Sequence, residues 1–457
     1  HGYRNNSRAR KIMIIIDWLI LEVRRRYLKK FLSQSTQHKK RNKKEILRIK
    51  DNKPHEVFYL HQVDDPYSHL CCQVLDQLIA SYEIKIIPLV VGMPPQSTTP
   101  EVELLKQHSI DDATIIAPYY GLNFSTKRNE IPIEMIEKAQ SILLSTNSTR
   151  FASKAKRVGE ALWQNNRIAL DEMLKKTKPI THQDVKERIE VNNIKRKQLG
   201  HYLGAVFAYE GECYWSIDRL AFLEERLKDL NVRKHNKELV IKRNSLKTNT
   251  PLISSQKMTI DFFISARSPY SYLALKQLIE LKKQLPLKIN YRPILPMVMR
   301  GMKIDLEKGM YILSDCKRIA NQKEISFGNI TDPLGRAVER FYSLFPYVKE
   351  LNKEEEFFDL FLTAVWANGK HGYLDSTLKN IIRKLDLPWD DAKKELDTDY
   401  WREEIENNRK AMYKIGKWGP PSFAVKNQNN EVLINLWGQD RLWLIEEMMY
   451  LMKDKDK

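Results

Sequence analysis

The chain has 457 residues, a formal net charge of +19 and a hydrophobic content of 42%. This length exceeds one ordinary domain, and the composition is that of a globular chain in which each domain can bury a core. Four cysteines without a C-x-x-C spacing exclude a disulfide framework, disfavour thiol–disulfide exchange and fit a reducing, cytoplasmic setting.

Residues 1–53 form a basic leader that carries +13 of the net charge. Within the segment from Lys11 to Leu32 the apolar run is interrupted by Asp17 and Glu22, so it is shorter than the about 20 residues of a membrane-spanning helix. It also lacks the small-residue cleavage site of a secretory signal. Two interpretations stay open: a helix docked on the folded body, or a membrane-peripheral helix that binds anionic lipid through residues 11–50. Without interleaved aromatic residues, the basic leader gives little support for nucleic-acid binding.

Residues 54–230 predict a first α/β domain. The segment "EVFYLHQVDDPYSHLCC" predicts a strand, a turn and a helix, and "KIIPLVV" predicts a second strand. About a hundred residues with helical periodicity follow, and further strands and a final helix close the domain. Cys71 and Cys72 are interpreted as buried thiols of the first helix, and the basic, polar residues 231–257 predict a linker.

Residues 258–457 repeat this order of elements. In "IDFFISARSPYSYLA", Ser268 stands 203 residues after Asp65 of the first domain, and Asp315 stands 203 residues after Asp112. Further on, "WGPPSFAV" pairs with "YLGAVFAY", and "LWGQDRLWLIEEM" pairs with "YWSIDRLAFLEER". Four blocks in one order predict a tandem duplication of an α/β domain with an inserted helical subdomain.

The turn Ser268-Pro269-Tyr270-Ser271 has the form of a redox motif in which oxygen replaces both sulfurs. A serine cap followed by proline is also an ordinary helix start, and the two roles are compatible. A free thiol has a pKa near about 8.5, which a helix N-terminus and a hydroxyl donor can lower. Because serine cannot form a mixed disulfide, the turn suits a thiolate that a cofactor supplies.

The blocks "DFFISARSPYSYLA", "YRPIL", "KGMYILSD", "GPPSF" and "WGQDRL" together resemble the DsbA-like branch of the thioredoxin superfamily. Within that branch they look like the glutathione-dependent 2-hydroxychromene-2-carboxylate isomerases and kappa-class glutathione transferases. The resemblance covers residues 258–450 well and 54–230 weakly. It implies two tandem thioredoxin-like domains of the DsbA/kappa type, with glutathione as cofactor and an electrophilic aromatic or unsaturated small molecule as substrate.

The resemblance also implies roles for individual residues. Ser268 is the expected catalytic residue, which hydrogen-bonds the glutathione sulfur, and Pro421 is the expected cis-proline. The remaining expected contacts are Pro420, Gln439, Asp440 and either Lys308 or Lys303 for glutathione, and Tyr270, Trp366 and Asn368 for the substrate pocket. Pro420 has no N–H, so one of the two backbone bonds that relatives make to glutathione is missing. Helix capping by Asp440 and core packing of Trp366 are alternative roles. No metal site is expected.

The first domain lacks these features. Asp65, Ala205 and Ile217 stand where Ser268, Pro421 and Gln439 stand in the second. We expect no glutathione chemistry there, because a carboxylate would repel a thiolate, and the first domain would serve as a built-in partner in an internal pseudo-dimer. The leading hypothesis is therefore a glutathione-dependent isomerase or transferase with one working site. The alternative is a non-catalytic scaffold or binding module, tethered to a membrane surface or an acidic partner by its leader.

Overall fold

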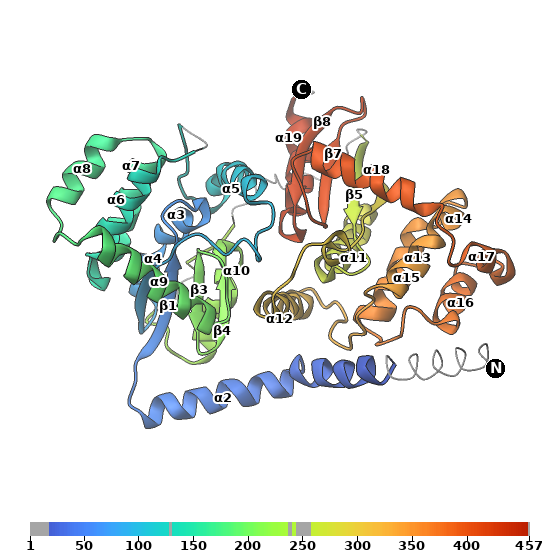
Figure 1. Cartoon of the computed structure of the whole chain (residues 1–457), viewed down its shortest axis with the longest axis horizontal. Coiled ribbons are helices and arrows are strands. Elements are labelled where there is room, and N and C mark those ends of the chain that lie inside the picture. The colour runs from blue at the N-terminus through green and yellow to red at the C-terminus, as the bar shows by residue number, and fades with distance from the viewer. Residues whose placement is uncertain (1–17, 128–129, 236–239, 244–256, 456–457) are drawn as a thin grey trace, which may run out of the picture. The chain divides into compact units, whose positions relative to one another are not determined.

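The computed structural model describes residues 18–127, 130–235, 240–243 and 257–455 (Figure 1). Their contacts divide the chain into two units. The first unit holds residues 40–246 and 304–311, and the second holds the residues up to Lys39, 247–303 and 312–457. Each unit contains one four-stranded sheet, so the α/β class expected from the sequence is confirmed.

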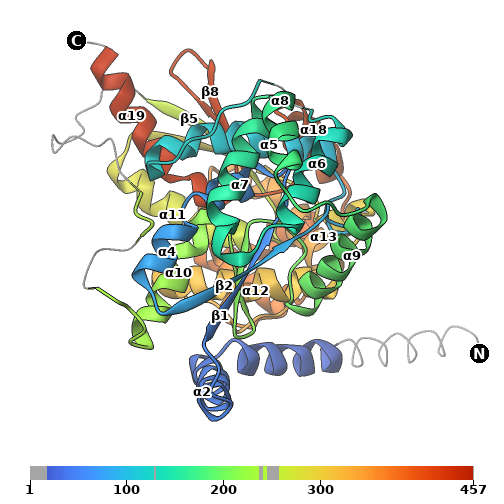
Figure 2. The same ribbon diagram turned by 90° about the vertical axis from the view of Figure 1, so that its left-hand side faces the viewer.

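The sheet of the first unit has the order β2-β1-β3-β4. Its strands are β1 (His55–His61), β2 (Ile84–Val90), β3 (Val206–Tyr209) and β4 (Glu212–Trp215). β1 and β2 are parallel (Figure 2), so their connection must cross over, and α3 (Pro66–Cys72) and α4 (Leu75–Ser81) form that crossover. β3 pairs antiparallel with both β1 and β4, and α10 (Ser216–Asp229) then contacts α3 and β4.

Between β2 and β3 the first unit is helical. The segments are α5 (Val102–Ile116), η1 (Ala117–Tyr120), α6 (Ile133–Leu144), α7 (Ser148–Trp163), α8 (Arg167–Lys175) and α9 (His182–Gln198). The apolar pattern of α7 explains why this part of the chain folds into helices. Four apolar residues recur at helical spacing and are all buried: Phe151, Ala155, Val158 and Leu162. Asn147 starts this helix by accepting the N–H of Arg150.

The sheet of the second unit repeats the topology of the first. Its order is β6-β5-β7-β8, formed by β5 (Met258–Ile264), β6 (Leu287–Pro293), β7 (Ser422–Lys426) and β8 (Val432–Trp437). The β5–β6 pair is parallel, and the other two pairs are antiparallel. α11 (Pro269–Gln284) connects the parallel pair, while η3 (Gln439–Arg441) and α19 (Trp443–Lys455) follow the last strand.

The second unit also has its helices between its second and third strands. They are η2 (Met297–Arg300), α12 (Leu306–Gln322), α13 (Arg336–Ser343), α14 (Phe345–Glu350), α15 (Glu354–Trp366), α16 (Asp375–Lys384), α17 (Trp389–Glu395) and α18 (Trp401–Lys414). An aromatic cluster joins α13 to α15, where the ring of Phe341 lies 3.8 Å from that of Phe361 and 4.3 Å from that of Phe357. The expected helical insert is therefore present in both units.

Three segments of the chain group in ways that the sequence alone does not indicate. The first turns of α12, residues 306–311, group with the first unit although they lie far along the chain. Residues 18–31 are helical and group with the second unit, and α2 (Gln34–Lys50) leads from them to β1. Part of the expected linker is packed, because Arg233 bridges to Tyr82 and the carboxylate of Glu224 accepts the N–H of Val240 at 2.7 Å. Residues 244–256 of that linker lie outside the described part.

All four cysteines are free and buried, as expected for Cys71 and Cys72. Burial raises the pKa of the Cys71 thiol well above its ordinary value, so that side chain stays protonated. Across the residues described here, no helix is both long and apolar enough to cross a membrane. In the same residues, no group of three or more His, Cys, Asp or Glu side chains could hold a metal ion.

Candidate functional site

Ser268 caps the N-terminus of α11 at the end of the central strand β5. Its backbone is extended, its Oγ accepts the N–H of Ser271 at 3.1 Å, and Pro269 takes the first helical position. Proline fits there because the first helical N–H has no partner within the helix. The turn is held from within by Ser271, whose Oγ accepts the N–H of Ser265 at 3.3 Å. The Ser268 hydroxyl therefore lies at the positive end of a 16-residue helix.

The loop before β7 meets this turn. The Ser268 hydroxyl donates to the carbonyl of Pro420 at 3.3 Å, and the peptide bond between Pro420 and Pro421 is cis. Gly438, after β8, donates its N–H to the carbonyl of Pro421 at 2.9 Å. The structure thus brings together Ser268, Pro420 and Pro421, three of the residues expected at the site.

A positive charge adjoins Ser268 in the turn. Arg267 makes a two-pronged ion pair with Asp332, with distances of 2.7 and 2.9 Å. Asp332 also lies 3.5 Å from Arg24 of the helix formed by residues 18–31. The N-terminal helix and the turn therefore share one carboxylate, which fixes the side chain of Arg267.

Gln439 and Asp440 lie beside α11. The amide of Gln277 donates to Oε1 of Gln439 at 2.7 Å, and the amide of Gln439 donates to the Asp440 carboxylate. Gln439 is buried, whereas Asp440 is partly exposed. The oxygen and the nitrogen of the Gln439 amide are therefore both hydrogen-bonded within the unit. Asp440 is more accessible than Gln439.

The three side chains expected in the substrate pocket have different environments. Tyr270 donates its hydroxyl to the buried carboxylate of Asp315 at 2.8 Å. Trp366 is buried, stacks on Phe327 and donates Nε1 to the carbonyl of Ala266 at 3.3 Å, so it packs in the core behind the turn. Asn368 is exposed on the loop after α15.

Lys308 is not grouped with Ser268. It lies in the segment 304–311 of the first unit, where its ammonium donates to the carbonyl of Thr98 at 2.6 Å and lies 5.4 Å from the ring centre of Tyr202. Burial lowers its pKa to about 8. Lys303, the alternative residue, is exposed.

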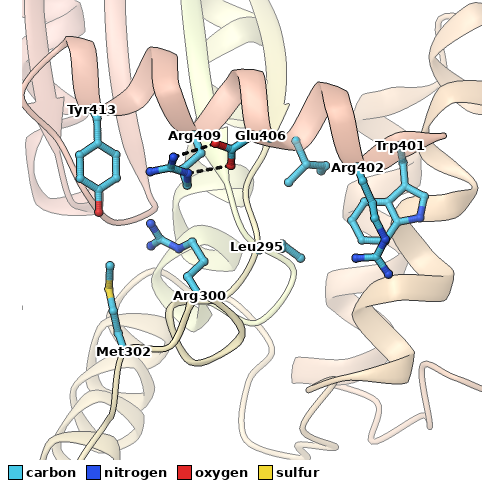
Figure 3. Close-up of a pocket in the computed structure, with 9 residues that line it drawn as sticks. Leu295, Arg300, Met302, Trp401, Arg402, Glu406, Arg409 and Tyr413 are labelled. Carbon is cyan, nitrogen blue, oxygen red and sulfur yellow. Dashed lines mark hydrogen bonds and ion pairs between the residues drawn. The ribbon is translucent and has the colours of Figure 1, made fainter. Parts of the chain in front are cut away.

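Sequence reasoning missed a hollow of about 430 Å³ beside the Pro420 loop (Figure 3). It is lined by Leu295, Arg300 and Met302 after β6, and by Trp401, Arg402, Ile405, Glu406, Arg409 and Tyr413 of α18. Arg300 donates to the carbonyl of Trp418 at 2.9 Å, so the hollow and Ser268 contact the same loop. The helical spacing of the α18 residues was the available signal.

The first unit has a turn of the same form. Asp65 caps α3 and accepts from the N–H of Tyr67, the N–H of Ser68 and the Ser68 hydroxyl, at 3.2, 3.0 and 2.7 Å. Burial raises the pKa of Asp65 to about 6. Tyr67 donates to Asp112 at 2.7 Å, which matches the Tyr270–Asp315 pair 203 residues later. Ala205, at the position of Pro421, has a positive φ of 55°.

Several solved structures are similar to one half of the chain. A 2-hydroxychromene-2-carboxylate isomerase has 21% identity and a TM-score of 0.37, and the match covers 43% of this chain and 97% of that one. The cytosolic disulfide reductase DsbM from Pseudomonas aeruginosa, solved with GSH, has 13% identity and a TM-score of 0.33, with 43% and 98% covered. A probable DsbA oxidoreductase from Streptomyces coelicolor has 12% identity and a TM-score of 0.35, with 42% and 89% covered. A search of curated proteins found no match. Residues 259–449 match the family model of the DSBA-like thioredoxin domain, and the second unit contains such a domain.

Proposed function

We propose that the second unit is a glutathione-dependent isomerase or transferase for an electrophilic aromatic or unsaturated small molecule. The observation that carries this proposal is the Ser268 hydroxyl, which lies at the N-terminus of α11 and against the Pro420 carbonyl. A hydroxyl and a helix N-terminus both favour an anion at this point. Serine offers no sulfur for disulfide exchange. The Ser268 turn therefore has the form of a redox-active turn but not its chemistry.

The residues of the turn fit a thiol-bearing cofactor in part. Among the described residues, the Ser268 hydroxyl donates only to the Pro420 carbonyl, at 3.3 Å, and a thiolate can replace that carbonyl as acceptor. The carbonyl of Pro420 can accept a backbone N–H, but Pro420 donates none, which costs about 1 kcal/mol of binding. In this proposal Asp440 receives the amino group of the cofactor. When bound, glutathione would supply the thiolate that adds to the electrophile.

The chain's own part in the reaction is electrostatic. The hydroxyl of Ser268 and the N-terminus of α11 lower the pKa of a thiol at this point, and the proton leaves to solvent. The hydroxyl keeps its own proton, so the serine is neither nucleophile nor base. In an isomerase the thiolate leaves again after the substrate has rearranged, whereas in a transferase it stays attached to the product.

The first prediction concerns Ser268. Calorimetric titration of glutathione should give a dissociation constant in the micromolar to low millimolar range. The bound thiol should titrate about one unit or more below its free pKa, as followed by ultraviolet thiolate absorbance. Ser268→Ala should lose this shift, and Ser268→Thr, which keeps the hydroxyl, should retain most of it.

Ser268→Asp is the decisive control. Aspartate caps a helix as well as serine does, so the variant should fold, but its carboxylate should repel the thiolate, as expected for Asp65. If wild type gives no heat at millimolar glutathione, or if Ser268→Asp shows an unchanged thiol pKa, glutathione chemistry at this turn is excluded.

The two units are, in this proposal, tandem copies of one domain, of which the first has lost the thiol site. Equal strand order, equal strand directions and the matched Tyr67–Asp112 and Tyr270–Asp315 pairs support this. The carboxylate of Asp65 at the capping position argues against a thiolate in the first unit.

A second role, attachment to an anionic membrane surface, is supported by the helix at residues 18–31. Its inner face is docked within the second unit: Leu28 and Leu32 are buried, and Arg25 donates to Asn329 at 2.6 Å. Its outer face exposes four large apolar side chains, each 49–68% accessible, at Leu19, Ile20, Val23 and Tyr27. At 100° per residue these lie within about 100° of arc. Exposed Arg24 and Arg26 flank them, as in interfacial helices.

The membrane role predicts binding to vesicles that contain phosphatidylserine and none to pure phosphatidylcholine. The double substitution Val23→Glu and Tyr27→Glu should weaken co-sedimentation by about tenfold or more, because it places charge in the apolar stripe. Tyr400→Glu, at an exposed position of the second unit, is the matched control and should have no effect. Equal binding by both variants would contradict the role.

A further inference from the structure

The first unit keeps a cavity over its own turn. This cavity has a volume of about 430 Å³, within the usual range for small-molecule sites. The turn residues Asp64, Asp65 and Tyr67 line it, together with Gly204 before β3 and Trp215 at the end of β4. The turn has therefore lost the serine without losing the space above it.

The charge of this turn is opposite to that of the second unit. Asp64 and Asp65 stand where the second unit has Arg267 and Ser268, 203 residues later. The cavity lining includes the carboxylates of Asp64, Asp65, Glu103 and Glu130 and one ammonium, that of Lys106. Lys106 lies 3.0 Å from Glu103, so it is paired with another lining carboxylate at the rim.

Among the residues that the structure describes, neither turn carboxylate has a cation at hydrogen-bond distance, and Lys106 acts on Asp64 only from farther away. Asp64 accepts from the Gln62 amide, at 3.1 Å, and from its own backbone N–H, and Asp65 accepts from Tyr67 and Ser68. Burial raises the pKa of both carboxyl groups. An anion that is partly shielded from water and has no cation in direct contact is costly, and a bound cation would offset that cost.

The floor of the cavity stays open because residue 204 is glycine. A Cβ there would lie 3.1 Å from Oδ2 of Asp65, 2.9 Å from the Ser68 hydroxyl and 2.7 Å from Cβ of Gln62. Any side chain would collide with Gln62 and cover the carboxylate. Glycine thus leaves the approach to Asp65 free.

Aromatic rings form the walls. Trp215 lies edge-on to Tyr67, with ring centres 5.5 Å apart. Trp163, which also lines the cavity, is 3% exposed, and its Nε1 has no hydrogen-bond partner in the described structure. Rings of this kind attract organic cations through their faces.

We infer that this cavity binds an organic cation: an ammonium or guanidinium group at Asp64 and Asp65, carried on an apolar body between Tyr67, Trp215 and Trp163. A metal ion fits less well, because the described residues offer no cluster of three or more metal-ligating side chains. The inference concerns the first unit and does not depend on the glutathione site proposed for the second.

The test is calorimetric titration of the full chain with phenethylamine and with spermidine. Both should bind with dissociation constants below about 10 mM, and the isosteric alcohol 2-phenylethanol should bind at least about tenfold more weakly. Asp64→Asn should weaken phenethylamine binding by about tenfold or more, and Asp65→Asn should do the same while keeping the helix cap. Asp171→Asn, which removes an exposed carboxylate outside the cavity, and Ser268→Ala should leave binding unchanged.

Three outcomes would overturn the inference. The first is the absence of saturable heat with both amines. The second is equal binding of phenethylamine and its alcohol, which would make the cavity merely apolar. The third is binding of Ca²⁺, competing with the amines and lost in Asp64→Asn, which would make it a metal site. Thermal unfolding of each variant shows whether the first unit remains folded.

Discussion

Asp65 and Ser268 perform the same local task with opposite charge. Each accepts backbone N–H groups at the start of the helix after the central strand. The sequence predicted both helix starts correctly, because a cap followed by proline is a local signal. It could not predict how far Asp65 is shielded from water, since its surroundings come from distant parts of the chain such as Gly204.

The raised pKa of Asp65 predicts a pH dependence of stability. The ordinary aspartate pKa is 3.8, and burial raises that of Asp65 to about 6 in the folded state. The folded protein therefore binds a proton more tightly than the unfolded chain. Below about pH 4 this carboxyl group does not change the stability of the first unit. As the pH rises to about 6 the stability falls, and above pH 6 the group destabilises the first unit by about 1–3 kcal/mol.

Asp65→Asn should remove this dependence, because asparagine keeps the cap and cannot ionise. Urea unfolding at several pH values from 4 to 8 measures the free energy of unfolding of both proteins. The variant should gain stability relative to wild type as the pH rises from 4 to 6 and then hold that gain. A constant difference between the two proteins over this range would refute the predicted titration. Asp171→Asn, exposed and paired with Lys138, is the control.

At the scale of elements, strands and helices were predictable and their docking was not. Alternating and continuous apolar runs placed all four strands around the two turns, and helical periodicity placed the inserts. The sequence allows two interpretations of the N-terminal helix, because the residues that it contacts lie far away in the sequence. Arg25 bonds Asn329, and Trp18 stacks on His371 at 5.8 Å, contacts that leave no periodic trace in sequence.

The same reasoning explains the outcome for the site residues. Ser268 and Pro421 belong to short blocks with a strong local signal, and the structure brings both to one point. Trp366 and Tyr270 carried no comparable signal, and their side chains are used for packing and for the bond to Asp315. The sequence suggests Lys308 as a glutathione contact only from its position in the chain. Its actual contacts depend on the first turns of α12, which belong to the first unit.

For the whole molecule, the two halves of the sequence are not the two units. Residues 304–311 belong to the first unit, which otherwise ends at residue 246. Tyr311 lies in the apolar cluster of Leu60, Val91, Val206, Ala208 and Cys213, and its ring meets that of His201 at 4.3 Å. Asp305 accepts from Ser97 at 3.0 Å, and Lys308 bonds Thr98. The first unit is therefore complete only when the later segment is present.

This arrangement predicts that the first unit cannot be separated at the linker without loss. Tyr311→Ala in the full chain should destabilise the first unit by about 2–4 kcal/mol, because it empties a buried position. Calorimetric unfolding, with urea titration followed at each unit's own tryptophans, measures the effect. Tyr400→Ala, which truncates an exposed side chain, is the matched control and should stay within about 0.5 kcal/mol of wild type. A fragment of residues 40–246 should be less stable than the same residues in the full chain. If the fragment matches the full chain, or if Tyr311→Ala is as mild as Tyr400→Ala, the segment only lies against the first unit and does not complete it.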